Sequence, residues 1–124
     1  MKDFIIIIVI VGLIIGGSVY SHHFYEKLQE QFSNELQKLV DNIEIDTDKE
    51  KTISDIEQIW LNYETILIIF QDHASIGEIE DNLYECFHHY RMNDLNKLIL
   101  YKEKTVSGFE DLIKREELLL VDIL

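Results

Sequence analysis

Apolar residues are distributed along this chain in two different patterns. Residues 4–20, FIIIIVIVGLIIGGSVY, form one run of 17 residues that contains no charged side chain. Beyond this run, apolar residues recur every three or four positions among polar ones, which is the period of an amphipathic helix. The first pattern predicts a helix that is apolar on every side, and the second predicts helices that each bury one face.

The uncharged run is just long enough to cross a bilayer. As a helix it would extend about 25 Å, close to the lower limit for the hydrocarbon core. Lys2 stands before it, and Tyr20 and Phe24 stand at its far end, residue types suited to the two membrane interfaces. We therefore expect residues 4–20 to contact membrane lipid and residues 1–22 to form a single transmembrane anchor.

Small residues near the end of the run bear on its processing and packing. Gly16 and Ser18 offer a poor cleavage site followed by the bulky Val19, so an uncleaved anchor is favoured over a signal peptide. Gly12 and Gly16 have the G-x-x-x-G spacing that allows two membrane helices to pack closely. This spacing is also frequent by chance in membrane helices, so the chain is either a homodimer through its anchor or has two unrelated glycines there.

Lysine placement indicates the orientation of the anchor. Lys2 and the amino group precede the run, and Lys27 is the first lysine after it. Cytoplasmic flanks carry more Lys and Arg in most membrane proteins, and the difference here is small. A short N-terminal anchor normally leaves its tail in the cytoplasm. We expect a single-pass protein of the cell membrane, with its N-terminus cytoplasmic and its C-terminal domain extracytoplasmic.

Residues 23–124 predict an acidic helical domain. Its apolar stripes fall into four runs that begin at Leu28, Ile53, Ile76 and Leu95, and the first run continues from the anchor without a helix breaker. Short connections favour antiparallel neighbours. The expected fold class is therefore all-α: an N-terminal transmembrane helix followed by an up-and-down bundle of about four helices. A two-hairpin, repeat-like arrangement is the alternative.

Polar residues mark the expected starts of these helices. Thr47-x-x-Glu50 and Ser75-x-x-Glu78 have the form of capping boxes, in which side chains satisfy exposed backbone N–H groups. Asn93-Asp94 is typical of a turn followed by a cap. We expect the second and third helices to begin at the two boxes and the fourth to follow the turn.

Three segments lead to more specific expectations about packing. Residues 66–70 (ILIIF) are apolar all round, so we expect them to be the most buried part of the domain. Ser107-Gly108 is expected to weaken or bend the last helix. Residues 118–124 (LLLVDIL) are too apolar for a free end, and we expect them to fold back on the bundle.

Composition excludes several classes of protein. The chain has no proline and a single cysteine, so it has no internal disulfide. Its formal net charge is −13, almost all of it after residue 21. Nucleic acid is excluded as a partner, because phosphate binding needs a basic face. Divalent cations or a basic protein surface fit this charge, and solubility alone is the simplest explanation of it.

Asp72 and His73 form the first candidate for a functional site. They lie in the turn after the all-apolar segment, where a carboxylate beside an imidazole can orient it for metal binding or proton transfer. The simpler interpretation is a helix end, at which either side chain satisfies free backbone groups.

A second group combines Glu85, Cys86, His88 and His89, which are residue types that bind metals. Adjacent helical residues point about 100° apart, so the two histidines cannot share one ion, whereas zinc needs three or four ligands. The default is a buried Cys86 with solvent-facing imidazoles. No phosphate loop, nucleophile elbow or Cys-x-x-Cys occurs. We therefore expect no enzyme activity, no cofactor and no metal.

The residues from Trp60 onward resemble a known family. They comprise Trp60 and the apolar run to Phe70, the Asp72-His73 pair, Ile79 and Leu83, and the ending Glu117-x-Leu119-x-x-Asp122-Ile123-Leu124. Together with the anchor, they resemble the domain of unknown function 4363 family of spore-forming, low-GC bacteria. The resemblance covers most of the chain and implies a small membrane-anchored helical protein, without any catalytic residue. Asp122 departs from the pattern, since Asn is expected there.

Two functions are consistent with these observations. The first is a protein-interaction module in the cell envelope, whose partner is another membrane or envelope protein. The alternative is a ligand- or cation-responsive sensor that uses the acidic face or the Asp72-His73 turn.

Overall fold

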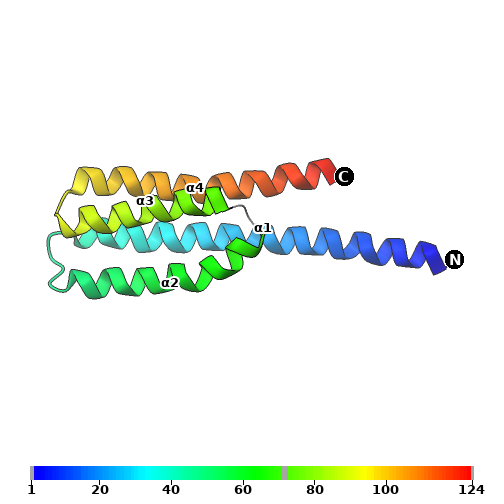
Figure 1. Ribbon diagram of the computed structural model, residues 1–124, viewed down its shortest axis with the longest axis horizontal. Coiled ribbons are helices and arrows are strands. Elements are labelled where there is room, and N and C mark those ends of the chain that lie inside the picture. Colours follow the sequence, from blue (N-terminus) through cyan, green and yellow to red (C-terminus); the bar gives the residue numbers. More distant parts are fainter. Residues whose placement is uncertain (1, 71–72, 124) are drawn as a thin grey trace.

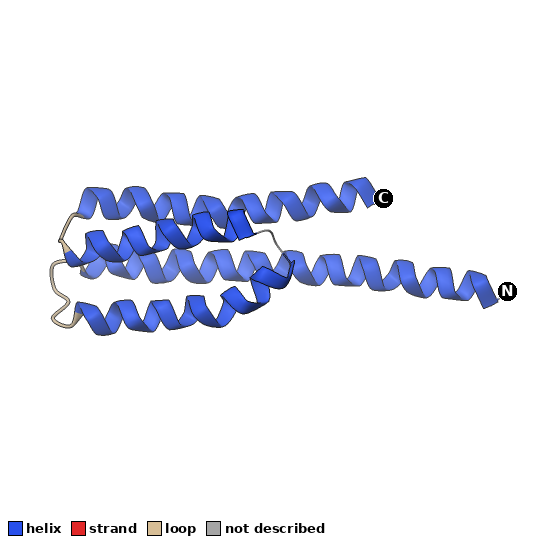
Figure 2. Cartoon of the chain, in the orientation of Figure 1, coloured by secondary structure: helices blue, strands red, loops and turns tan. Residues whose placement is uncertain are grey.

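A computed structural model describes the backbone of residues 2–70 and 73–123, and side chains for residues 2–16, 22–69 and 73–115. These residues form helices α1 (Lys2–Asn42), α2 (Lys49–Phe70), α3 (His73–Arg91) and α4 (Leu95–Ile123). The helices alternate in direction along the chain (Figures 1 and 2). α4 packs along both α1 and α3, and α2 packs against α3. The predicted all-α bundle is confirmed, and no strand occurs in the described ranges.

The connections α1–α2 and α3–α4 lie at one end of the bundle (Figure 1). The turn predicted at Asn93-Asp94 is confirmed: Asn93 has φ 57°, and the backbone N–H of Lys97 donates to Asp94 Oδ1 at 3.2 Å. The capping box predicted at Thr47 misplaces the capping residue of α2 by one position. Asp48 caps α2 instead, because its Oδ1 accepts from the backbone N–H of Lys51 at 3.3 Å.

The box at Ser75 does not start a helix either. α3 begins two residues earlier, at His73. Ser75 lies inside the first turn, and its hydroxyl accepts a hydrogen bond from the guanidinium of Arg115 on α4. The serine therefore joins two helices, a role that a local sequence pattern does not reveal.

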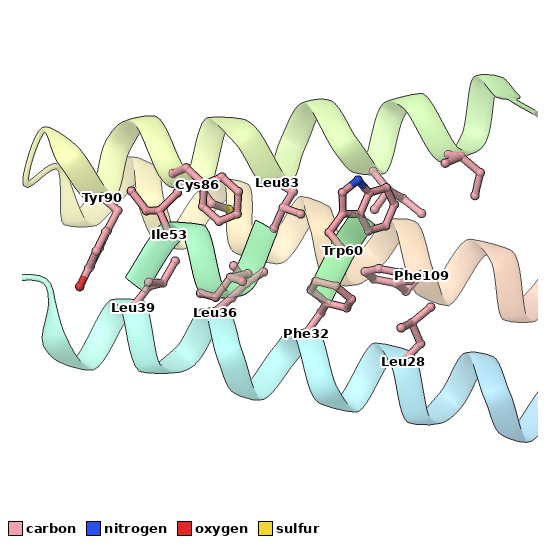
Figure 3. Packing of buried hydrophobic residues seen from close by; sticks show 14 of the residues in the cluster. Leu28, Phe32, Leu36, Leu39, Ile53, Trp60, Leu83, Cys86, Tyr90 and Phe109 are labelled. Atoms are coloured by element: carbon pink, nitrogen blue, oxygen red, sulfur yellow. The ribbon is translucent and has the colours of Figure 1, made fainter. Parts of the chain in front are cut away.

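Aromatic side chains fill the centre of the bundle (Figure 3). The ring of Phe32 stacks on Phe109 at 5.2 Å between centroids, and Trp60 meets both edge-on at 5.9 and 6.2 Å. All three side chains are fully buried. Such pairs stabilise a core by about 0.5–1.5 kcal/mol each beyond burial alone. This cluster holds α1, α2 and α4 together at one level of the bundle.

Gly108 permits a close crossing of α3 and α4. A Cβ atom placed on Gly108 would lie 2.6 Å from Cγ1 of Ile79, far inside van der Waals contact. α4 is continuous through Ser107-Gly108. The glycine thus serves helix packing, whereas the sequence suggested a weakened or bent helix.

Two helices project beyond the α2–α3 connection (Figure 1). α1 is one continuous helix from Lys2 to Asn42, as predicted from the lack of a breaker after the apolar run. The last turns of α4 continue as helix to Ile123, so the expectation that residues 118–124 fold back is wrong for the backbone. Side chains of these residues lie outside the described part. No helix, within the part of the chain that is described, is long and apolar enough to cross a membrane.

Candidate functional site

The projecting part of α1 exposes a continuous apolar surface. We call residues 4–16 the apolar extension. Its large side chains are 41–71% exposed, from Ile14 at the lower limit to Leu13 at the upper. A Cβ atom on Gly12 or Gly16 would meet nothing within 4 Å. The predicted packing face of the anchor is therefore open, and a homodimer through these glycines stays a prediction.

The end of α2 exposes a second apolar surface. Ile66, Ile68 and Ile69 are 42, 37 and 71% exposed, and we call these three residues the α2 end patch. Only Leu67 between them is buried. The expectation that residues 66–70 are the most buried segment is thus wrong for Ile66, Ile68 and Ile69. The bundle covers one face of α2, so a helix end that is apolar all round leaves its other sides uncovered.

The predicted Asp72-His73 turn is described only in part. Asp72 lies outside the described residues. His73 is the first residue of α3, and its side chain is exposed. The sensor hypothesis that rests on this pair stays a prediction.

The side chains of the group around Cys86 lie in different surroundings. Cys86 is fully buried with its Sγ 3.9 Å from Thr105 Oγ1, and burial raises the pKa of its thiol to about 12. His88 is exposed, while His89 is largely covered, stacking on Tyr101 at 5.3 Å. Among the described side chains, no group of three or more His, Cys, Asp or Glu is placed to hold a metal ion.

An open groove of about 640 Å³ runs between α3 and α4. Its polar lining is predominantly acidic. The charged side chains are Glu78, Asp81, Glu103 and Asp111, against Lys104 and Arg115. Glu78 and Asp81 lie on α3 and the other two carboxylates on α4, so the groove depends on the close pairing of these helices at Gly108. Sequence patterns along one helix therefore missed it.

A buried polar atom faces the acidic side of α3. The indole Nε1 of Trp60 points toward α3 (Figure 3) and has no hydrogen-bond partner in the described part of the chain. Burial and the neighbouring Glu64 raise the pKa of Glu80 on α3 above the ordinary carboxyl value. The nearby indole N–H of Trp60 lowers this pKa, but by less. This carboxyl thus lies in a setting that disfavours its charged form.

Asp46 joins the α1–α2 connection to the bundle. Its Oδ2 accepts from Thr52 Oγ1 at 2.6 Å and from the hydroxyl of the fully buried Tyr90, and its Oδ1 accepts from the backbone N–H of Asp48 at 2.9 Å. The Lys49 ammonium donates to the Tyr90 carbonyl at 3.0 Å. These bonds fasten the connection rather than form a binding pocket.

The architecture defines the chain as an all-α, up-and-down helical bundle with an apolar helical extension at one end. Comparisons with protein families, with curated proteins and with solved structures find no match to it. The resemblance to the domain of unknown function 4363 family therefore stays a prediction.

Proposed function

We propose that this chain is a membrane-anchored helical protein whose bundle serves as a protein-interaction module in the cell envelope. The apolar extension is the observation that carries the proposal. Exposed apolar surface costs about 25 cal/mol for each Å² left in water, and large contiguous patches mark contacts with membranes or partners. Residues 4–20 would insert into the bilayer as a single-pass anchor, with residues 1–22 as the anchor and residues 23–124 as the interaction domain.

The acidic α3–α4 groove is the surface that best suits a protein partner. Four carboxylates and two cations line it, so its net charge matches the sign of the whole chain. A basic segment of another membrane or envelope protein would complement it, and opposite charges guide such partners together. The extracytoplasmic orientation belongs to the same proposal.

Membrane attachment is tested by extraction of membranes with alkaline carbonate. The native chain should remain in the membrane pellet. The double variant I7D/I10D should be released, because each buried carboxylate costs about 3 kcal/mol at the centre of a membrane helix. I45D is the matched control, since Ile45 is equally apolar and 72% exposed but lies at the other end of the bundle. Release of the native chain by carbonate would refute the anchor.

Partner binding is tested by photo-crosslinking in intact membranes. A crosslinking amino acid at Glu103, inside the groove, should capture one protein in near-stoichiometric yield. The same amino acid at Asp55, an exposed position on α2, should not capture it. The charge-reversal variant D81K/D111K should reduce the yield. Equal capture from both positions, or none from either, would contradict a module that binds through this groove.

A further inference from the structure

We infer that the α2 end patch is a second membrane contact, which rests in the interfacial layer of the same bilayer that holds α1. This inference depends on the proposed anchor and adds to it a fixed position of the bundle on the membrane. It follows from the level that α2 reaches along α1, from the side chains at that level and from the small size of the patch.

A ring contact sets the level of α2 along α1. Phe24 and Tyr63 meet edge-on at 5.8 Å between ring centroids. α2 runs antiparallel to α1 (Figure 1), so residues after Tyr63 lie beside residues before Phe24. Ile69 is six residues further on, about 9 Å of helix rise. α2 bends in its last turns (Figure 1), so Ile69 reaches at most the level of residue 18 and lies close to the end of the uncharged run 4–20.

An independent contact shows that α4 reaches further along α1 than α2 does. Phe109 stacks on Phe32 at 5.2 Å, and α4 also runs antiparallel to α1. The helical backbone of α4 continues through Ile123, which lies as far beyond Phe109 as residue 18 lies before Phe32. α4 thus extends past the end of α2, and both helices reach the part of α1 where the uncharged run ends (Figure 1).

Side chains between the α2 end patch and the centre of the bundle suit lipid headgroups. Phe24, Lys27 and Tyr63 line a groove of about 330 Å³ between α1 and α2. Aromatic rings and snorkelling lysines are the residue types enriched at membrane interfaces. The headgroup region is about 5–8 Å thick on each side of the hydrocarbon core. Tyr63 would therefore lie at headgroup depth when Ile69 touches the acyl boundary.

The size of the patch favours lipid over a second protein surface. The exposed surface of its three residues together equals that of about one and a half fully exposed isoleucines. Stable protein interfaces bury roughly 800 Å² and 20–30 residues on each partner, far more than this patch offers. Lipid needs no such minimum area, because the same bilayer already surrounds the helix beside the patch.

Spin labels on the full-length chain in phospholipid vesicles test the inference. One cysteine at a time is introduced at Ile69, at Ile8 in the apolar extension, or at Ile45. The native Cys86 is fully buried and should therefore not react with the label. Ile45 is the matched control, being 72% exposed against 71% for Ile69. Labels at Ile8 and Ile69 should be more accessible to oxygen than to a water-soluble nickel complex, and the label at Ile45 should show the reverse.

Three results would overturn the inference. A label at Ile69 that behaves like Ile45, with Ile8 still in lipid, leaves the anchor intact and removes the second contact. A label at Ile69 shielded from both oxygen and nickel reports a covering protein, either a partner or a second copy. Labels at Ile8 and Ile69 that are both open to nickel refute the anchor as well. A label at Ile68 should give the same result as the label at Ile69, which excludes an effect of one label on its own surroundings.

Discussion

Gly108 and Gly77 lie in neighbouring helices, but a methyl group would meet different surroundings at each. At Gly108 it would overlap Ile79, whereas at Gly77 nothing lies within 4 Å. We expect Gly108→Ala to lower the free energy of unfolding by about 1–3 kcal/mol, because overpacking forces helices or rotamers to shift. Gly77→Ala should raise it by up to about 1 kcal/mol through helix propensity. Urea denaturation measures both changes.

A double-mutant cycle identifies the cause. In an Ile79→Ala background, Gly108→Ala should lose most of its cost, since the overlapping Cγ1 atom is absent. An unchanged cost in that background would place the strain elsewhere than the α3–α4 contact.

Glu80 should make stability depend on pH. Its raised pKa, caused by burial and by Glu64, means that the folded chain binds this proton more tightly than the unfolded chain. Stability therefore falls as pH rises from the ordinary value of 4.5 through the raised pKa. Glu80→Gln should unfold at a higher temperature than the native chain at pH 7, and the two should converge below pH 4.5.

Asp81→Asn provides the control for this comparison, because Asp81 is an exposed neighbour of Glu80. An equal gain from Asp81→Asn would attribute the effect to the overall negative charge. Thermal melts between pH 4 and pH 8 distinguish the two explanations.

At the scale of elements, Asp46 should fasten the α1–α2 connection through its charge. Hydrogen bonds from Thr52 and Tyr90 lower its pKa below the ordinary 3.8. Its stabilisation is therefore present above that value and is lost as pH falls through the lowered pKa. Asp46→Asn should lower the unfolding midpoint at pH 7, and the difference should shrink in acid. Asp55→Asn, on the exposed side of α2, should leave the midpoint nearly unchanged.

The sequence predicts the elements well and their ends less well. Apolar periodicity and the lack of proline are enough to predict a continuous α1 and an all-α bundle. The start of α2 was misplaced because Asp46, Thr47 and Asp48 are all plausible caps, and the structure selects Asp48 by its bond to Lys51. Local patterns cannot rank such neighbours, since the choice depends on where the connection is fastened.

The sequence also did not predict which helix surfaces are covered by other helices. Residues 66–70 look like a core segment because apolarity alone does not reveal which sides the other helices cover. The α3–α4 groove was missed for a related reason, as its two walls are far apart in sequence. Both features require the arrangement of the helices, which no single stripe encodes.

At the scale of the whole molecule, the α3–α4 connection and the N-terminus of α1 should lie on opposite sides of the membrane. Met92 is 65% exposed and lies in the α3–α4 connection, which is at the end of the bundle away from the apolar extension. A cysteine introduced at Met92 should react with a membrane-impermeant maleimide in intact cells. The native Cys86 gives no background, because its thiol is buried with a pKa of about 12 and the thiolate is the reactive form.

A cysteine at Lys2 tests the other side of the membrane. It should react only after lysis, since the N-terminus is expected in the cytoplasm. Labelling of the Met92 site only after lysis would reverse the proposed orientation.

The unbroken course of α1 has a consequence for distance. Between residue 20 and Asn42 the helix contains no interruption, and these residues span about 33 Å. If residues 4–20 lie in lipid, as proposed, α1 would act as a spacer that holds the α1–α2 and α3–α4 connections at a set height above the membrane. Removing seven residues, about two turns, would lower that height by about 10 Å while keeping the same helix face outward. The bundle would then no longer lie at the height of a partner that is itself fixed in the membrane.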